Sequence, residues 1–216
     1  MKLAAFFAAL AAVAACNSHP STDKRDAPAW VGQTKNALTI RAIDNQSTYL
    51  KQLVDQVPPS SVVKGATDMW RGEDAAAQTE PYLYGPSPEA IAAYLATRPA
   101  PPAGEQIAFE KLGTDRWRTH LVDASAALDA TAIVQAEVTD FDGRPGLMVE
   151  LTRNGGREFA ALTAEHVGHK LAIEANGKIV MSPVIESKIT GGKVAITLGA
   201  GATQADAEKL ADALAL

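Results

Sequence analysis

The sequence predicts an α+β domain in which helices pack on one face of a largely antiparallel sheet. Three turn signals carry this prediction. Gly113-Thr114-Asp115, Asp142-Gly143 and Asn176-Gly177 each separate two apolar runs, as in β-hairpins. Separate helical segments accompany the hairpins, without the regular strand–helix–strand alternation that gives a parallel sheet. The 216 residues are 47% hydrophobic, which is enough to bury a core.

The charge balance and the cysteine content exclude several classes of protein. The chain has a formal net charge of −5 and a single cysteine, Cys16. Nucleic acids and anionic membrane surfaces bind clustered Lys and Arg side chains, which this composition does not supply, so no nucleic-acid partner is expected. One cysteine also excludes a disulfide framework within the chain.

The first 16 residues predict export and lipid anchoring. One lysine precedes a short apolar run that ends in small residues, which is typical of a signal peptide, here residues 1–15. Val13-Ala14-Ala15-Cys16 resembles the bacterial lipobox, in which the cysteine is acylated and becomes the new N-terminus. We therefore expect lipidation at Cys16 and a membrane-anchored protein that faces the periplasm, with inner or outer membrane left open. The alternative is an ordinary signal peptide with a chance cysteine.

The next segments are a linker, a strand and a helix. Residues 16–36 are polar, contain proline and lack apolar periodicity, which predicts a flexible tether. Residues 37–44 alternate apolar and polar, the pattern of a strand with one buried face. Residues 47–54 have leucines at helical spacing behind a Ser/Thr cap, and Pro58-Pro59 predicts that the helix has ended.

Residues 60–102 form a loose, proline-rich region in which only one helix is expected, at residues 87–95. There Ser87 is the cap, Pro88 occupies the first helical position and Glu89 the first turn. The other glycines and prolines of the region interrupt every period, so we expect irregular chain around this helix.

The remainder of the chain is regular. Two helices are expected, one at residues 154–167 with Gly168 as its left-handed cap, and one that Thr203 begins. The expected strands share β-branched and apolar residues bounded by turn signals. They are residues 107–112, 116–122, 130–138, 146–151, 170–175, 178–182 and 191–197.

Six short phrases follow one another in the last third of the sequence. They are Leu162-Thr163-Ala164-Glu165-His166-Val167-Gly168, Leu171-Ala172-Ile173, Asn176-Gly177-Lys178-Ile179-Val180, Ser182-Pro183-Val184-Ile185, Ile189-Thr190-Gly191-Gly192 and Asp206-Ala207-Glu208-Lys209-Leu210-Ala211. In order and spacing they resemble the head subdomain of the first periplasmic domain of SecD and SecDF, a family of membrane proteins of protein export. Residues 38–44 and 142–145 are similar to two further segments of that family.

The resemblance implies a division and a function. Residues 37–139 would be a SecD base-like region with a Pro-rich insert, and residues 140–216 the head-like subdomain. The family's head is thought to hold the translocating polypeptide, so the resemblance implies binding of unfolded polypeptide or of Sec components. After Cys16 no apolar stretch approaches 20 residues, so the six membrane-spanning helices of the family, and proton-driven pumping, are not expected here.

No residue cluster predicts catalysis, a metal or a cofactor. His166, His169 and Glu165 have a superficial metal-ligand spacing, but Gly168 separates the histidines and no further ligand follows. The acidic residues of the 137–142 segment lack the twelve-residue calcium loop and are better explained by a solvated turn. We expect a non-enzymatic protein without a cofactor.

Aromatic residues gather in the loose region and suggest a binding surface. Trp70, Tyr82, Tyr84 and Tyr94 could contact a partner, although a local core beneath a long loop is the more common role of such residues. Trp70, Tyr82, Tyr84 and Val180 are the candidate peptide-binding residues. Two functions follow: a tethered module that binds extended polypeptide beside the export machinery, or a structural or interaction lipoprotein with one fixed protein partner.

Overall fold

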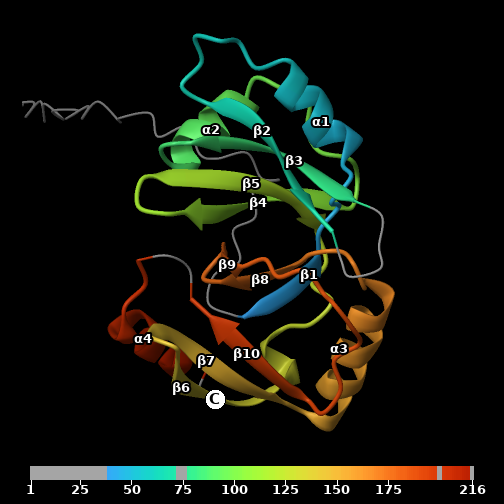
Figure 1. Cartoon of the computed structure of the whole chain (residues 1–216), viewed down its shortest axis with the longest axis vertical. Coiled ribbons are helices and arrows are strands. Elements are labelled where there is room, and N and C mark those ends of the chain that lie inside the picture. Colours follow the sequence, from blue (N-terminus) through green and yellow to red (C-terminus); the bar gives the residue numbers. More distant parts are fainter. Residues whose placement is uncertain (1–37, 72–76, 199–200, 215–216) are drawn as a thin grey trace, which may run out of the picture.

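The described part of the chain folds into two β-sheets with two helices on each (Figure 1). A computed structural model describes residues 38–71, 77–198 and 201–214. The signal peptide of residues 1–15, Cys16 and the tether of residues 16–36 lie outside the described residues, so the predictions made for them stay predictions.

The larger sheet has seven strands in the order β1-β8-β9-β4-β5-β3-β2. All of its ladders are antiparallel except that of β4 with β9, which pairs Glu110 with Ile179 in parallel. The strands are β1 (Thr39–Ala42), β2 (Lys64–Trp70), β3 (Gln78–Gly85), β4 (Glu105–Leu112), β5 (Arg116–Asp123), β8 (Leu171–Ala175) and β9 (Lys178–Met181).

The smaller sheet has three antiparallel strands in the order β10-β7-β6. In Figure 1 it lies with α3 and α4 at one end of the molecule, while α1 and α2 lie with β2 and β3 at the other. The remaining elements are β6 (Ile133–Phe141), β7 (Arg144–Leu151), β10 (Lys193–Thr197), α1 (Thr48–Asp55), α2 (Pro88–Leu95), α3 (Arg153–Glu165), α4 (Gln204–Leu214) and a single 3-10 turn (Ala130–Ala132).

Each end of the molecule has its own hydrophobic core. Leu50, Leu83, Ile91 and Leu121 are fully buried between α1, α2 and the strands β3 to β5. The larger core joins β1 and β8 to the small sheet, α3 and α4, and includes the fully buried Leu147. The predicted α+β class with mainly antiparallel strands is confirmed. The strands form two sheets, however, where the sequence predicted one.

The turn and cap signals are also confirmed. Asn176-Gly177 has φ values of 51° and 73°, and Asp142-Gly143 has 54° and 79°, the left-handed pair that a tight two-residue hairpin requires. Ser87 accepts a hydrogen bond from the Ala90 N–H at 3.2 Å and so caps α2 as predicted.

The expectation of irregular chain in residues 60–102 is wrong. β2 and β3 form a continuous antiparallel pair there, from Lys64 opposite Tyr84 to Trp70 opposite Gln78. Pro81 is tolerated inside β3 because β3 pairs with β5 only at Tyr84 and Gly85, so the missing N–H of proline interrupts no ladder on that side.

Removing one helix cap tests how much such a cap stabilises the folded protein. Ser47 is buried and its Oγ accepts a hydrogen bond from the Leu50 N–H at 3.1 Å, at the start of α1. We expect Ser47→Ala to lower the free energy of unfolding by about 1 kcal/mol, measured by urea denaturation. Ser125→Ala, at an exposed serine outside any helix or strand, should leave it nearly unchanged, and equal losses in both variants would contradict the capping role.

Candidate functional site

Five charged side chains on neighbouring strands and one from a preceding loop form one interacting set, which we name the ion cluster. Asp68 on β2 lies opposite Glu80 on β3, and Glu110 on β4 lies opposite Arg118 on β5. His120 follows Arg118 two residues along β5, and Lys170 comes from the segment before β8. The cluster therefore joins residues from distant parts of the sequence, three acidic and three basic.

His120 is the most enclosed member of the ion cluster. Its side chain has no solvent exposure, its Nδ1 lies 2.5 Å from Glu80 Oε1, and its Nε2 lies 2.9 Å from Glu110 Oε2. Carboxylates accept hydrogen bonds, so each ring nitrogen needs a proton to face one. This geometry therefore fits a doubly protonated, positively charged imidazolium.

Arg118 and Lys170 supply the other positive charges that neutralise the three carboxylates of the ion cluster. Arg118 pairs with Glu110 and donates to Asp68 Oδ2 at 2.5 Å. Lys170 Nζ lies 2.8 Å from Glu80 and 3.3 Å from Asp68. Ser182 accepts from Arg118 at 3.0 Å and donates to Glu110 at 3.0 Å. Each carboxylate thus contacts at least one cation.

The pKa values of the cluster follow from these contacts. Burial alone would raise the pKa of Glu80, but the charges and hydrogen bonds of His120 and Lys170 lower it to about 2. Burial opposes the charged form of Glu110 in the same way, and His120 and Arg118 lower its pKa to about 2. Burial would lower the pKa of His120, and Glu80 together with Glu110 raises it above its ordinary value.

Three of the predicted aromatic residues lie beside the ion cluster. The Lys170 ammonium lies 4.3 Å from the ring centre of Trp70, and the Arg118 guanidinium 5.6 Å from that of Tyr82. Trp70 Nε1 donates to the Gly168 carbonyl at 3.0 Å, which ties the end of β2 to the segment before β8. Tyr84 packs on Tyr82 with ring centres 6.2 Å apart. These half-buried rings therefore form one aromatic and cationic surface.

The strand β2 is an edge of the larger sheet. Its seven residues pair with β3 without a register shift, and within the described ranges no backbone hydrogen bond joins its outer side to another segment. At the opposite edge, the backbone of β1 is bonded to Ala127 and Leu128. Met69 on β2 is 76% exposed, the largest exposure among the large hydrophobic side chains described. This edge is open to an added strand.

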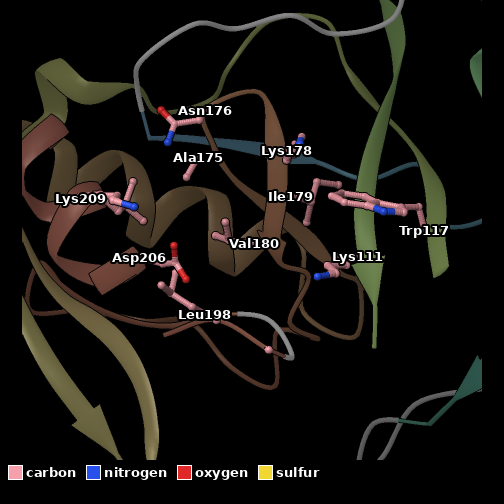
Figure 2. A pocket seen from close by; sticks show the side chains of 13 residues that line it. Lys111, Trp117, Ala175, Asn176, Lys178, Ile179, Val180, Leu198, Asp206 and Lys209 are labelled. Atoms are coloured by element: carbon pink, nitrogen blue, oxygen red, sulfur yellow. The ribbon is translucent and has the colours of Figure 1, made fainter. Parts of the chain in front are cut away.

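Val180 lies elsewhere, in a cavity of about 420 Å³ between β9, α4 and the β4–β5 hairpin. Figure 2 shows Lys111, Lys178 and Trp117 on one side of this cavity and Asp206 and Lys209 on the other. None of Trp70, Tyr82 and Tyr84 lines it. The structure thus brings three of the four candidate residues together and places Val180 in a separate site.

Sequence reasoning missed the ion cluster, although one signal for part of it was present. The predicted hairpin around Gly113-Thr114-Asp115 places Glu110 opposite Arg118 once the three-residue turn is counted. Glu80 and Asp68 lie on strands that were not predicted, and Lys170 reaches them only through the tertiary fold.

The ion cluster is suited to holding strands together. Ser182 faces a carboxylate and a guanidinium, and no histidine of the described residues forms a hydrogen bond with its hydroxyl. His166, one of the two histidines with metal-ligand spacing in the sequence, contacts the Leu162 carbonyl through Nδ1 at 2.8 Å. Asp140 accepts a hydrogen bond from the Gly143 N–H at 2.7 Å within its turn. Over the described ranges no helix is both long and apolar enough to cross a membrane.

Comparison with curated proteins finds protein translocase subunits named SecD. A segment of 115 residues is 30% identical to the protein translocase subunit SecD of Magnetococcus marinus, covering 51% of this chain and 22% of the relative. A segment of 71 residues is 42% identical to SecD of Sebaldella termitidis, covering 32% of this chain and 18% of the relative. The chain thus spans about a fifth of the length of these relatives.

Solved structures give weaker likenesses. A structure described as a membrane component SecDF that enhances protein export aligns with 86% of this chain and 64% of its own, at a TM-score of 0.45 and 19% identity. SecDF in a super-membrane-facing form aligns with 82% of this chain and 28% of its own, at a TM-score of 0.40 and 18% identity.

A family model settles the relationship that the six sequence phrases predict. The model described as SecDF, P1 head subdomain, matches residues 106–215, which is half of the chain. The resemblance to the SecD and SecDF head is thereby confirmed, and the chain belongs to the SecDF P1 head subdomain family.

Proposed function

We propose that this protein is a lipid-anchored protein of the bacterial envelope that binds extended polypeptide in the periplasm and assists Sec-dependent export without catalysing a reaction. The observation that carries the proposal is the open edge of β2 beside the half-buried rings of Trp70, Tyr82 and Tyr84. The membership of the P1 head subdomain family supports a role in protein translocation.

An open strand edge suits a partner without a fixed sequence. An extended polypeptide can pair with β2 through backbone N–H and C=O groups, which every residue except proline supplies in full. The exposed side chain of Met69 offers an adaptable apolar contact on one face of the sheet, and the tyrosines offer flat rings with polar ends on the other face. Affinity therefore depends little on the sequence of the bound chain.

The ion cluster helps to hold β2 in place. Asp68 and Trp70 hold β2 to Lys170 and Gly168, so the edge is presented by a fixed strand. A strand that is already ordered loses less conformational entropy when it binds, which favours association. We infer that the cluster has a structural role and that the protein is not an enzyme.

A crosslinking experiment in cells tests polypeptide binding. A photoreactive residue is placed at Met69, Tyr84 or Val180 in turn, and captured proteins are identified by mass spectrometry. We expect capture of many secreted polypeptides and of Sec components from Met69 and Tyr84. The matched control is Val134, which is 57% exposed on β6, another edge strand, where a register shift next to it disrupts the ladder.

Two outcomes contradict the proposal. If one envelope protein dominates at every position, the protein is an interaction lipoprotein with a fixed partner. If Val134 captures the same polypeptides as Met69, exposure alone explains the crosslinks.

A fractionation experiment tests the anchor. The lipobox-like segment that ends at Cys16 supports acylation there, and two or more acyl chains hold a protein firmly at a bilayer. We expect Cys16→Ser to shift the protein from the membrane to the soluble periplasmic fraction, measured by immunoblotting of separated fractions. Ser18→Ala is the control in the same segment, and retention of Cys16→Ser in the membrane fraction would show that Cys16 is not the anchor.

A further inference from the structure

The cavity that contains Val180 is built by four separate parts of the chain. The end of the β4–β5 hairpin contributes Lys111 and Trp117, and α4 contributes Asp206, Lys209 and Leu210. The β8–β9 hairpin contributes Ala175, Asn176 and residues 178–180, and the segment between β10 and α4 contributes Leu198, Gly201 and Ala202. Its volume of about 420 Å³ is in the range of sites that hold one or two side chains or a small ligand. Figure 2 shows these parts facing one another across the cavity.

The inner surface of this cavity is apolar. Ile179 is 3% exposed and Leu210 5%, and both belong to hydrophobic cores of the protein. Val180 and Leu198 add aliphatic surface, and the Trp117 ring forms part of the wall. An apolar side chain that enters the cavity would lose water contact and gain these neighbours.

The lining of the same cavity is positively charged. Lys111, Lys178 and Lys209 are exposed and come from three different elements, in a chain whose net charge is −5. The lining holds one carboxylate, Asp206, whose Oδ2 already accepts from the backbone N–H and hydroxyl of Thr203 at 2.9 and 2.7 Å. Lys178 lies 4.9 Å from the Trp117 ring centre and also interacts electrostatically with Glu89 on α2.

We propose that this cavity binds an apolar or aromatic side chain that has an acidic residue next to it in an extended polypeptide. The inference rests on the proposed polypeptide-binding function and adds a preference to it. The apolar group occupies the space between Val180, Leu210 and Trp117, and the adjacent carboxylate is attracted to the three ammonium groups. Charge complementarity selects this partner.

The concave shape of the site favours a polypeptide segment over a membrane surface. A surface that binds anionic lipid presents cations together with apolar groups that protrude into the bilayer. Here Ile179, Leu198 and Leu210 are buried at the bottom of the cavity, where a flat bilayer does not reach them. A single side chain on a flexible backbone can reach them.

Peptide binding tests the proposal with the full-length protein in detergent solution. Three fluorescent ten-residue peptides are compared by anisotropy: one with a central phenylalanine flanked by aspartates, one with it flanked by lysines, and one with alanine between aspartates. We expect the first peptide to bind about tenfold more tightly than either of the others, with a preference that falls as salt is added.

Variants locate the binding in the cavity. Combined Lys111→Gln, Lys178→Gln and Lys209→Gln should weaken the acidic phenylalanine peptide about tenfold. The control removes the same charge from three exposed lysines that do not line the cavity, Lys51→Gln, Lys188→Gln and Lys193→Gln, and should change the affinity less than twofold. The indole N–H signal of Trp117, assigned with Trp117→Phe, should shift on binding.

The outcomes separate this inference from the proposed function. Equal binding of acidic and basic peptides, an unshifted Trp117 signal, or binding of phosphatidylglycerol vesicles without any binding of peptide would overturn the proposed preference. If crosslinks from Met69 to many polypeptides persist in that case, the proposed function stands and only the inference fails. If no peptide binds and Met69 captures none, both are wrong.

Discussion

Replacing Glu80 with glutamine is expected to lower the free energy of unfolding by about 3 to 5 kcal/mol, measured by urea denaturation at pH 6. The glutamine has nearly the same shape, so the loss comes from charge. Glu80 has no solvent exposure and contacts both His120 and Lys170, at 2.5 and 2.8 Å. Without its carboxylate, a wholly buried imidazolium loses one of its two anionic partners, and the nearly buried ammonium of Lys170 keeps only Asp68.

Two comparisons make this prediction specific. Glu165→Gln, at an exposed residue at the end of α3, should change the stability by less than about 0.5 kcal/mol. Glu110→Gln should cost less than Glu80→Gln because the Glu110 side chain is 14% exposed. A loss below about 1 kcal/mol in Glu80→Gln would mean that the ion cluster does not hold the strands together.

The ion cluster matters for the proposed surface because it connects two ends of the molecule. Glu80 and Asp68 belong to the β2–β3 pair, while Lys170 and Ser182 flank the β8–β9 hairpin. No backbone hydrogen bonds of the sheet join these two strand pairs directly, because β4 and β5 lie between β9 and β3. The ion cluster therefore adds direct contacts, beside the Trp70–Gly168 hydrogen bond and the intervening strands, that hold the open edge of β2 relative to the head-like part of the chain.

The hairpins and caps could be predicted because their signals are local. Asn176-Gly177 and Asp142-Gly143 adopt positive φ values that few other residue pairs tolerate. The identity of two adjacent residues is therefore enough to predict each turn. Ser47 and Ser87 cap the helices that follow them through bonds that span three residues.

The site could not be predicted in the same way because its partners are distant in sequence. His120 and Glu80 are 40 residues apart, and Lys170 and Glu80 are 90 apart. The strand β3 escaped prediction because Pro81 normally argues against a central strand, and only the short overlap of β3 with β5 makes it acceptable. The aromatic residues were identified by composition, but their contact with buried cations depends on that unpredicted strand.

Stability is expected to fall on both sides of a maximum between about pH 5 and 6.5. The pKa values of Glu80 and Glu110 are lowered from 4.5 to about 2. The stability that their ionised carboxylates contribute is therefore fully present above pH 4.5 and is lost as the pH falls toward 2. One such shift corresponds to roughly 3 kcal/mol for a carboxyl group considered alone. The pKa of His120 is raised above 6.5, so its contribution is complete below 6.5 and is lost as the pH rises through the folded-state value.

Urea denaturation from pH 3 to 9 measures this profile, and a histidine titration by NMR identifies the group on the alkaline side. Glu80→Gln should reduce both slopes, because the glutamine does not titrate and no longer stabilises the imidazolium, whereas Glu165→Gln should leave the profile unchanged. Since His120 faces a carboxylate through each ring nitrogen, its loss of charge should coincide with the alkaline decline. A stability that stays constant from pH 6 to 9, or a His120 that titrates below 6.5, would mean that the imidazole is neutral in the folded protein.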